Sequence, residues 1–298
     1  KFADHRDPKS FEKLIDANTR AIFCESVGNP AGNITDFAAL AEIAHKHGIP
    51  LIVDNTVPSP YLCRPFEHGA DIVVHSLTKY LGGHGTNIGG ALVDSGKFPW
   101  KDHADKFPRL NTPDVSYHGV VYTEAFGPAA YIGRARVVPL RNMGAAISPF
   151  NSFLILQGIE TLALRMDRIC DNSLALAKYL QKHPKVKWVN YAGLPDNASH
   201  ALAQKYMGGR ASGILTFGID GGRPAGARFQ DALKLFTRLV NIGDAKSLAC
   251  HPASTTHRQL NPAELAKAGV SEDMVRLSVG IEHVDDLLAD LEQALAAA

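Results

Sequence analysis

The sequence predicts an α/β fold in which a mostly parallel sheet is followed by a smaller C-terminal α/β domain. Over residues 9–86, short apolar runs of strand length alternate with amphipathic helical stretches. Strands that are apolar on both faces are typical of a parallel sheet covered by helices. After residue 184, the strands and helices follow an order with an antiparallel look. We therefore expect a large domain over residues 1–170 and a small domain over residues 171–298.

The large domain is expected to contain several strands, each a short apolar run. Ser10 is in position to cap a first helix that extends to residue 15, and Asp36 to cap a second helix over residues 37–47. Gly48 would end that second helix, because glycine is common just past a helix C-terminus. The predicted strands are residues 21–25, 49–54, 71–76 and 91–93.

Residues 97–142 interrupt this alternation with many aromatic, proline and glycine residues. We expect an irregular segment with short helices, and long segments of this kind are usually functional or form an interface. Residues 149–182 predict one long helix that links the two domains, and Pro184 breaks it. In the small domain we expect strands at residues 187–191, 214–219, 239–242 and 275–279, and helices at residues 198–205, 225–236, 262–268 and 284–297.

Composition excludes several classes of protein. The 298 residues carry a net charge of +1 and no basic tract, so we expect no nucleic-acid partner. No apolar run approaches the roughly 20 residues that a membrane span needs. The 4 cysteines are widely spaced, which favours buried thiols in a cytoplasmic protein over disulfides or a metal site. His251 and His257 are interpreted as loop residues at the mouth of an active site rather than as metal ligands.

An acid and a lysine follow neighbouring predicted strands. Asp54 is the last residue of one buried strand, and Lys79 comes three residues after the next. Ligands of open α/β sheets bind at the carboxyl ends of the strands, and a buried carboxylate there needs a cationic or hydrogen-bonding partner. Alone, each residue has an ordinary explanation, such as a turn or a helix cap. Together they favour pyridoxal phosphate, whose ring nitrogen a carboxylate keeps protonated and whose aldehyde a partly desolvated lysine attacks.

Three further polar residues suit a phosphorylated cofactor and an amino-acid substrate. Ser76 and Thr78 flank the strand end before the lysine at a spacing of two, so both can reach one phosphate. Arg276 lies inside an otherwise apolar strand, where an unpaired charge is costly. A planar guanidinium that binds a carboxylate through two hydrogen bonds is what an amino-acid site needs, and an internal salt bridge is the alternative.

Six stretches, spread from near the start of the chain to near its end, share the pattern of one family. They read ESVGNP at residues 25–30, VDNT at 53–56, DIVVHSLTKY at 71–80, GIETL at 158–162, LACHP at 248–252 and VRLSVGIE at 275–282. The sequence resembles the Cys/Met-metabolism branch of pyridoxal-phosphate enzymes. The resemblance implies the type I fold of the aspartate aminotransferases.

The resemblance also implies how the cofactor is held. Lys79 would hold pyridoxal 5′-phosphate as a Schiff base and move protons during the reaction. Asp54 would pair with the ring nitrogen, and Ser76 and Thr78 would bind the phosphate.

For the substrate, the resemblance implies a second set of residues. Arg276 would bind the α-carboxylate, and Ser247 would lie on the neighbouring carboxylate-binding loop. Asn29 would lie near the cofactor O3′ and the same carboxylate.

Within the family, the chain resembles the O-acetylhomoserine sulfhydrylase subgroup in HGTNIGG at residues 84–90, GDAKSL at 243–248 and HPASTTH at 251–257. The aromatic segment after residue 97 is similar too. This resemblance implies γ-replacement on O-acetyl-L-homoserine with sulfide or methanethiol, giving homocysteine or methionine. A reaction of the cystathionine γ-synthase or methionine γ-lyase type stays open, as does a non-catalytic scaffold of the same fold.

The family pattern also bears on assembly and on the start of the chain. It implies a homotetramer, built as a dimer of dimers. It begins with a further N-terminal segment, including a glycine-rich phosphate turn, that has no counterpart in this sequence. We therefore expect the large domain to be incomplete at its N-terminus, as in a fragment or in one of two polypeptides.

Overall fold

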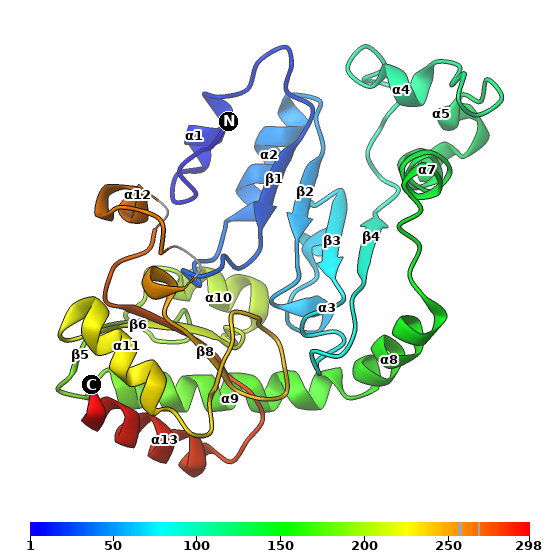
Figure 1. Ribbon diagram of the computed structural model, residues 1–298. Coiled ribbons are helices and arrows are strands. Elements are labelled where there is room, and N and C mark those ends of the chain that lie inside the picture. The colour runs from blue at the N-terminus through cyan, green and yellow to red at the C-terminus, as the bar shows by residue number, and fades with distance from the viewer. Residues whose placement is uncertain (256–257, 268) are drawn as a thin grey trace.

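The chain builds two sheets, which a long helix joins (Figure 1). The computed structural model describes residues 1–255, 258–267 and 269–298. In the first sheet, three parallel strands are followed by an antiparallel edge strand, in the order β1-β2-β3-β4. This agrees with the mostly parallel sheet predicted for the first half. The strands are β1 (Ile22–Glu25), β2 (Leu51–Asp54), β3 (Ile72–Ser76) and β4 (Gly90–Asp94).

Helix α2 (Phe37–Lys46) covers one face of the first sheet and begins as the sequence predicts, because the Asp36 side chain accepts a hydrogen bond from the Ala39 amide. The prediction for the first helix is wrong at its start. Helix α1 (Pro8–Glu12) is capped by Asp7, since a carboxylate accepts readily from the orphan amides and Pro8 suits the first helical position. Between β2 and β3 the chain forms α3 (Ser59–Leu62) and the 3-10 helix η1 (Pro65–His68).

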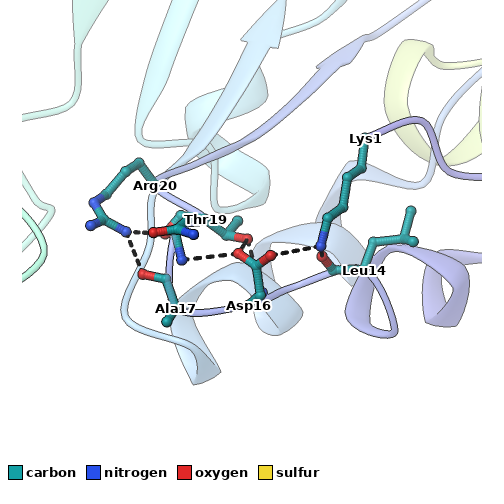
Figure 2. Close-up of polar contacts among 7 residues, drawn as sticks. Lys1, Leu14, Asp16, Ala17, Thr19 and Arg20 are labelled. Atoms are coloured by element: carbon teal, nitrogen blue, oxygen red, sulfur yellow. Dashed lines mark hydrogen bonds and ion pairs between the residues drawn. The ribbon is translucent and has the colours of Figure 1, made fainter.

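The N-terminal residue is tied to the loop that leads into β1 (Figure 2). The ammonium group of Lys1 donates to the Leu14 carbonyl at 2.9 Å and to the Asp16 carboxylate at 2.8 Å. Asp16 also accepts from the Thr19 hydroxyl at 3.0 Å, so this loop is held by its own side chains.

Residues 97–142 form the irregular segment that the sequence predicts, and they lie to one side of the sheets (Figure 1). Phe98, Trp100, Leu110 and Tyr122 build a small core of their own, which packs on Ile72 of β3. The elements are α4 (Pro108–Asn111), α5 (Tyr122–Ala125), the 3-10 helix η2 (Gly127–Ala129), α6 (Ala130–Ala135), the π-helix η3 (Arg136–Leu140) and α7 (Arg141–Met143).

The single long helix predicted over residues 149–182 is instead two helices, α8 (Pro149–Glu160) and α9 (Leu162–Leu180). They separate at Thr161, whose backbone leaves the helical region with φ −104° and ψ 6°. At this point a Cβ on Gly158 would lie only 2.2 Å from the Gly82 carbonyl, so the helix abuts the turn that carries Lys79. Apolar periodicity does not register a break caused by such a contact.

Helix α9 contacts α3 beside the first sheet and also β5, β6 and α13 of the second part. Residue 170, the boundary predicted between the two domains, falls inside this helix. The division into domains of residues 1–170 and 171–298 therefore stays a prediction. No helix in the described part of the chain is long and apolar enough to cross a membrane.

The second sheet has the order β5-β6-β9-β8-β7 and is antiparallel except between β7 and β8. Leu215, Phe217, Val275 and Leu277 point from its strands into the core beneath the helices. Its strands are β5 (Val186–Asn190), β6 (Ile214–Ile219), β7 (Thr237–Arg238), β8 (Leu248–Cys250) and β9 (Met274–Ser278). Its helices are α10 (His200–Met207), α11 (Gly222–Ala232), the 3-10 helix η4 (Pro252–Ser254), α12 (Pro262–Lys267) and α13 (Val284–Ala297).

The prediction of a strand over residues 239–242 is wrong. Residues 239–242 are a loop, whereas β7 lies just before them and β8 follows. The carbonyls of Val240 and Asn241 accept hydrogen bonds from the Arg276 side chain rather than from a neighbouring strand. An apolar run alone does not reveal this use of the backbone.

Candidate active site

The ends of β2 and β3 place polar side chains at one edge of the first sheet. Asp54 and Val74 are partners in the parallel ladder, and Ser76 is two residues further on, so Asp54 and Ser76 point to the same face. Thr56 bridges the two strand ends. Its amide donates to the Asp54 carboxylate at 2.9 Å, and its hydroxyl accepts from the Ser76 amide at 2.8 Å. The carboxylate and the serine are therefore fixed relative to each other.

The turn after β3 carries Lys79 and is held from two sides. The Thr78 hydroxyl accepts from the Gly89 amide at 3.1 Å. On the other side, the buried Arg165 of α9 donates to the carbonyls of Tyr80 at 2.8 Å and Gly158 at 2.6 Å. A guanidinium with several donors suits a turn whose carbonyls have no strand partner. The lysine therefore stands on a rigid support.

The amine of Lys79 reaches the second part of the molecule, where it donates to the side-chain oxygen of Asn241. Burial lowers the pKa of Lys79, and the positive charge of Arg276 lowers it further. A lysine in this state has a larger share of neutral, nucleophilic amine than an exposed one.

Arg276 lies in the middle of β9 and is 6% exposed. One terminal nitrogen donates to the Asn29 side-chain oxygen at 3.0 Å. The other donates to the carbonyls of Val240 at 2.6 Å and Asn241 at 3.0 Å. Burial lowers the pKa of Arg276 from its usual value. Its contacts are neutral oxygens, so the charge remains available to an anionic ligand.

These contacts join Lys79, Asn241, Arg276 and Asn29 into one hydrogen-bonded network. Its members come from the turn after β3, the loop before β8, strand β9 and the loop after β1. The structure thus brings the predicted lysine, arginine and asparagine together, although they are far apart in the sequence.

Ser247 is placed differently from the network. It is fully buried, its hydroxyl donates to the Glu282 carboxylate at 2.8 Å, and the same oxygen accepts from the Gly280 amide at 2.8 Å. Its side chain therefore connects two loops of the second part. Asn241, on the same loop between β7 and β8, is the residue that contacts Lys79 and Arg276.

Sequence reasoning missed Asn241 and Arg165. Asn241 lay inside a segment predicted as a strand, which hid its place in a loop. A glycine two residues later, Gly243, was the available sequence signal for a turn, and in the structure this glycine has a positive φ of 77°. Arg165 lies within α9, where a charged residue is usually on the solvated face, so the sequence held no signal for it.

The prediction for His251 is wrong. It is fully buried, and its ring nitrogens contact the Ser254 hydroxyl at 2.8 Å and the Glu272 carbonyl at 2.9 Å. Burial lowers its pKa. It follows β8 into a packed corner because Gly226 of α11 leaves room for the ring. His257 lies outside the described residues.

Comparison with known proteins identifies the family. The family model described as Cys/Met metabolism PLP-dependent enzyme matches residues 1–296. The chain belongs to this family.

Members of the Cys/Met-metabolism family resemble the chain over nearly its whole length. It is 52% identical to homocysteine synthase of Schizosaccharomyces pombe over 299 residues, which is 100% of this chain and 70% of that protein. It is 52% identical to O-acetyl-L-homoserine sulfhydrylase of Leptospira meyeri, over 99% of this chain and 68% of that protein.

A solved structure shares the fold with a TM-score of 0.94 and 45% identity, covering 99% of this chain and 70% of its own. It is a putative O-acetylhomoserine (thiol)-lyase from Campylobacter jejuni that contains N′-pyridoxyl-lysine-5′-monophosphate. The chain is therefore a pyridoxal-phosphate-dependent enzyme with the predicted fold.

The residues present fit the cofactor of this family. A lysine with a lowered pKa stands on the turn after β3, within reach of the second part of the molecule. A carboxylate and a serine share the adjacent sheet face. This set of donors and acceptors suits an aldehyde, a ring nitrogen and a phosphate.

Proposed function

We propose that this chain catalyses γ-replacement on O-acetyl-L-homoserine, in which sulfide displaces acetate and homocysteine forms. The names of its relatives, homocysteine synthase and O-acetyl-L-homoserine sulfhydrylase, support this substrate and product. One observation carries the proposal: the Lys79 amine and the Arg276 guanidinium are joined through Asn241. A group that moves a proton and a group that binds a carboxylate are what chemistry at an α-amino acid requires.

We assign substrate binding to Arg276, Asn29 and the segment that includes Ser247. The buried guanidinium binds the α-carboxylate, and the hydrogen bond from Arg276 to the Asn29 side chain, 3.0 Å long, fixes its direction. Ser247 supports this loop from within, through its hydrogen bonds to Glu282 and Gly280.

We assign cofactor binding to the first sheet. Lys79 would hold pyridoxal phosphate through its side-chain nitrogen until the substrate amine takes its place, and Ser76 and Thr78 would bind the phosphate. Asp54 would keep the proton on the ring nitrogen. When bound, the cofactor supplies an electron sink for the charge that forms when a proton leaves the α-carbon.

The reaction balances with sulfide as the only second substrate. The bond between the γ-carbon and the ester oxygen breaks, and acetate leaves with the electron pair. A carbon–sulfur bond forms at the same carbon. Lys79 takes the α-proton at its side-chain nitrogen and helps to move a β-proton, so that the γ-carbon can release acetate. Both protons are returned after the carbon–sulfur bond has formed. Its lowered pKa favours the neutral amine that accepts this proton.

An assay of the purified holoenzyme tests the reaction. O-acetyl-L-homoserine and sulfide should give homocysteine and acetate in equal amounts, and methanethiol in place of sulfide should give methionine if the acceptor site admits a methyl group. Breakdown of methionine or cystathionine alone, with no product from O-acetyl-L-homoserine and sulfide, would contradict the proposal.

Replacement of the lysine tests the site. Lys79→Ala should abolish the visible absorbance of the lysine-bound cofactor and lower turnover about a thousandfold, because general acid–base catalysis is lost. The exposed Lys101, in the segment of residues 97–142, provides the control. Lys101→Ala should keep both the absorbance and the rate. Unchanged visible absorbance in Lys79→Ala would rule out this lysine.

We further propose that the enzyme acts in the cytoplasm as a homotetramer, a dimer of dimers. The four cysteines are free and buried, which suits a reducing compartment. Helix α8 exposes Phe150, Phe153 and Leu156, and an apolar surface of this kind supports contact with another subunit. Sedimentation velocity of the holoenzyme measures the assembly state directly.

A further inference from the structure

A row of polar residues crosses the second sheet beside Arg276. Strand register aligns Asn190 of β5 with Thr216 of β6, and Thr216 with Arg276 of β9. Leu215 and Phe217, the neighbours of Thr216 along β6, point into the core. Because side chains alternate along a strand, Thr216 points to the opposite face, where Arg276 meets its partners.

The two outer members of this row hold the loop after β1. Asn190 donates to the carbonyl of Ala31, and its side-chain oxygen accepts from Asn197 at 2.6 Å. Arg276 donates to the side-chain oxygen of Asn29. Thr216 lies between these two anchors, under the loop that carries Asn29.

Thr216 is 1% exposed, yet its hydroxyl has no hydrogen-bond partner in the part of the chain that the structure describes. Among the same described residues, Nε of Arg276 also lacks an acceptor. Paired residues on adjacent antiparallel strands have Cβ atoms about 4.5–5.5 Å apart, so a hydroxyl and a guanidinium nitrogen can meet. One buried acceptor and one buried donor, both unused, thus sit on neighbouring residues.

The existing contacts of Arg276 indicate when its Nε and the Thr216 hydroxyl would meet. Both hydrogens of one terminal nitrogen are used by the carbonyls of Val240 and Asn241, and the other terminal nitrogen donates to Asn29. A guanidinium that receives a carboxylate through two hydrogen bonds has to release at least one of these oxygens. A new acceptor for Nε would then keep the guanidinium plane fixed.

We propose that Thr216 is a positioning residue for substrate recognition: its hydroxyl accepts a hydrogen bond from Nε of Arg276 when the guanidinium exchanges a backbone carbonyl for the substrate α-carboxylate. The inference rests on the proposed role of Arg276 and adds a residue of β6 to it. Thr216 contacts no substrate itself and acts through the arginine.

Thr216→Val tests this, because valine has nearly the same shape and lacks the hydroxyl. In the holoenzyme, KM for O-acetyl-L-homoserine should rise about tenfold, as expected for one lost hydrogen bond to a charged group. KM for sulfide should be unchanged, and kcat should stay within about twofold. Thr216→Ser retains a hydroxyl and should restore KM.

Thr123 provides the control, since it is also buried but lies in the segment of residues 97–142. Its hydroxyl donates to the Leu110 carbonyl at 3.2 Å. Thr123→Val should lower the melting temperature and leave KM unchanged. A Thr216→Val enzyme with a raised melting temperature and an unchanged KM would overturn the proposal, because the hydroxyl would then be merely an unpaired buried group.

A binding measurement separates this inference from the reaction proposed above. L-norvaline has the α-carboxylate and no leaving group, and its binding can be followed by the change in cofactor absorbance. Weaker binding by about tenfold in Thr216→Val, in an enzyme that fails to convert O-acetyl-L-homoserine, would reject the reaction and keep the inference. Equal binding by both proteins would reject the inference.

Discussion

The two sheets supply functional side chains in different ways. The first sheet presents them at the ends of its strands: Asp54 is the last residue of β2, Ser76 is the last residue of β3, and Lys79 lies on the turn beyond. The second sheet presents Arg276 and Thr216 from the middle of β9 and β6. The carboxyl ends of parallel strands meet at one edge of a sheet, so polar groups there lie close together. In the second sheet, β6 and β9 are buried along their whole length, and Thr216 and Arg276 lie on the face opposite Leu215, Phe217, Val275 and Leu277.

This difference suggests that the two sheets bind different molecules. The strand-end residues of the first sheet are assigned to the cofactor, and the face of the second sheet is assigned to the substrate. Among the described residues, the contacts that connect these two sets of side chains include those of Asn241 with Lys79 and of Arg276 with Asn29. Substitutions in the two sheets should therefore change different kinetic constants.

The largest effect is expected from the second sheet. Arg276→Gln should lower kcat/KM for O-acetyl-L-homoserine about a thousandfold, because a buried charge that pairs with the substrate carboxylate is lost. Cofactor content, measured by absorbance, should not change. Arg238→Gln, at an exposed edge of the same sheet, should keep wild-type kinetics. Loss of cofactor from Arg276→Gln would contradict the assignment of Arg276 to the substrate alone.

A change in the first sheet should reduce the rate rather than substrate affinity. Asp54→Asn keeps the shape and the contact with Thr56 but cannot hold a proton on the ring nitrogen, so kcat should fall about a hundredfold with KM nearly unchanged. Asp94 also ends a strand, but β4 is antiparallel and places it opposite Ile72 at the other end of the sheet. Asp94→Asn should leave kcat as it is. A rise in KM alone for Asp54→Asn would argue against its assignment to the cofactor.

The smallest effect concerns the pH dependence of the apoenzyme. The pKa of Lys79 is lower in the folded chain than in the unfolded one, so the unfolded state binds more protons between the two values. The free energy of unfolding should therefore rise with pH as the folded-state pKa is passed. Below that pKa the lysine is charged in both the folded and the unfolded state, so the full cost of burying the charge lowers the free energy of unfolding.

Lys79→Met removes this group and gives the comparison. The variant should be more stable than the wild type near neutral pH, and the difference should shrink towards high pH, as measured by urea unfolding of both apoproteins. A difference that stays constant with pH would show that the lysine is not held in a destabilised charged state.

Much of the first sheet could be predicted from the sequence. Asp54 and Ser76 end short apolar runs, and strand ends of a parallel sheet meet at one edge, so their proximity follows from the pattern. Arg276 stood out for a similar reason, since a charge inside an apolar strand requires an explanation. The contacts that connect these residues could not be predicted in the same way.

Those contacts depend on tertiary packing rather than on local pattern. Asn241 acts from a loop that the sequence presents as a strand, because the Arg276 side chain takes up its backbone carbonyl. The break between α8 and α9 arises where Gly158 meets the turn after Lys79. His251 is buried because a glycine of α11 makes room for it. None of these causes leaves a periodic signal in the sequence.

Helix α9 determines the distance between the two halves of the site. Arg165 fastens one of its ends to the turn of Lys79, and further along it packs under β5 and β6 (Figure 1). One residue inserted between these two attachments would advance the helix by about 1.5 Å and rotate it by about 100°. The reacting amine and the carboxylate-binding guanidinium would then no longer face each other. The number of residues in this helix is therefore under a geometric constraint that loops of the segment 97–142 do not share.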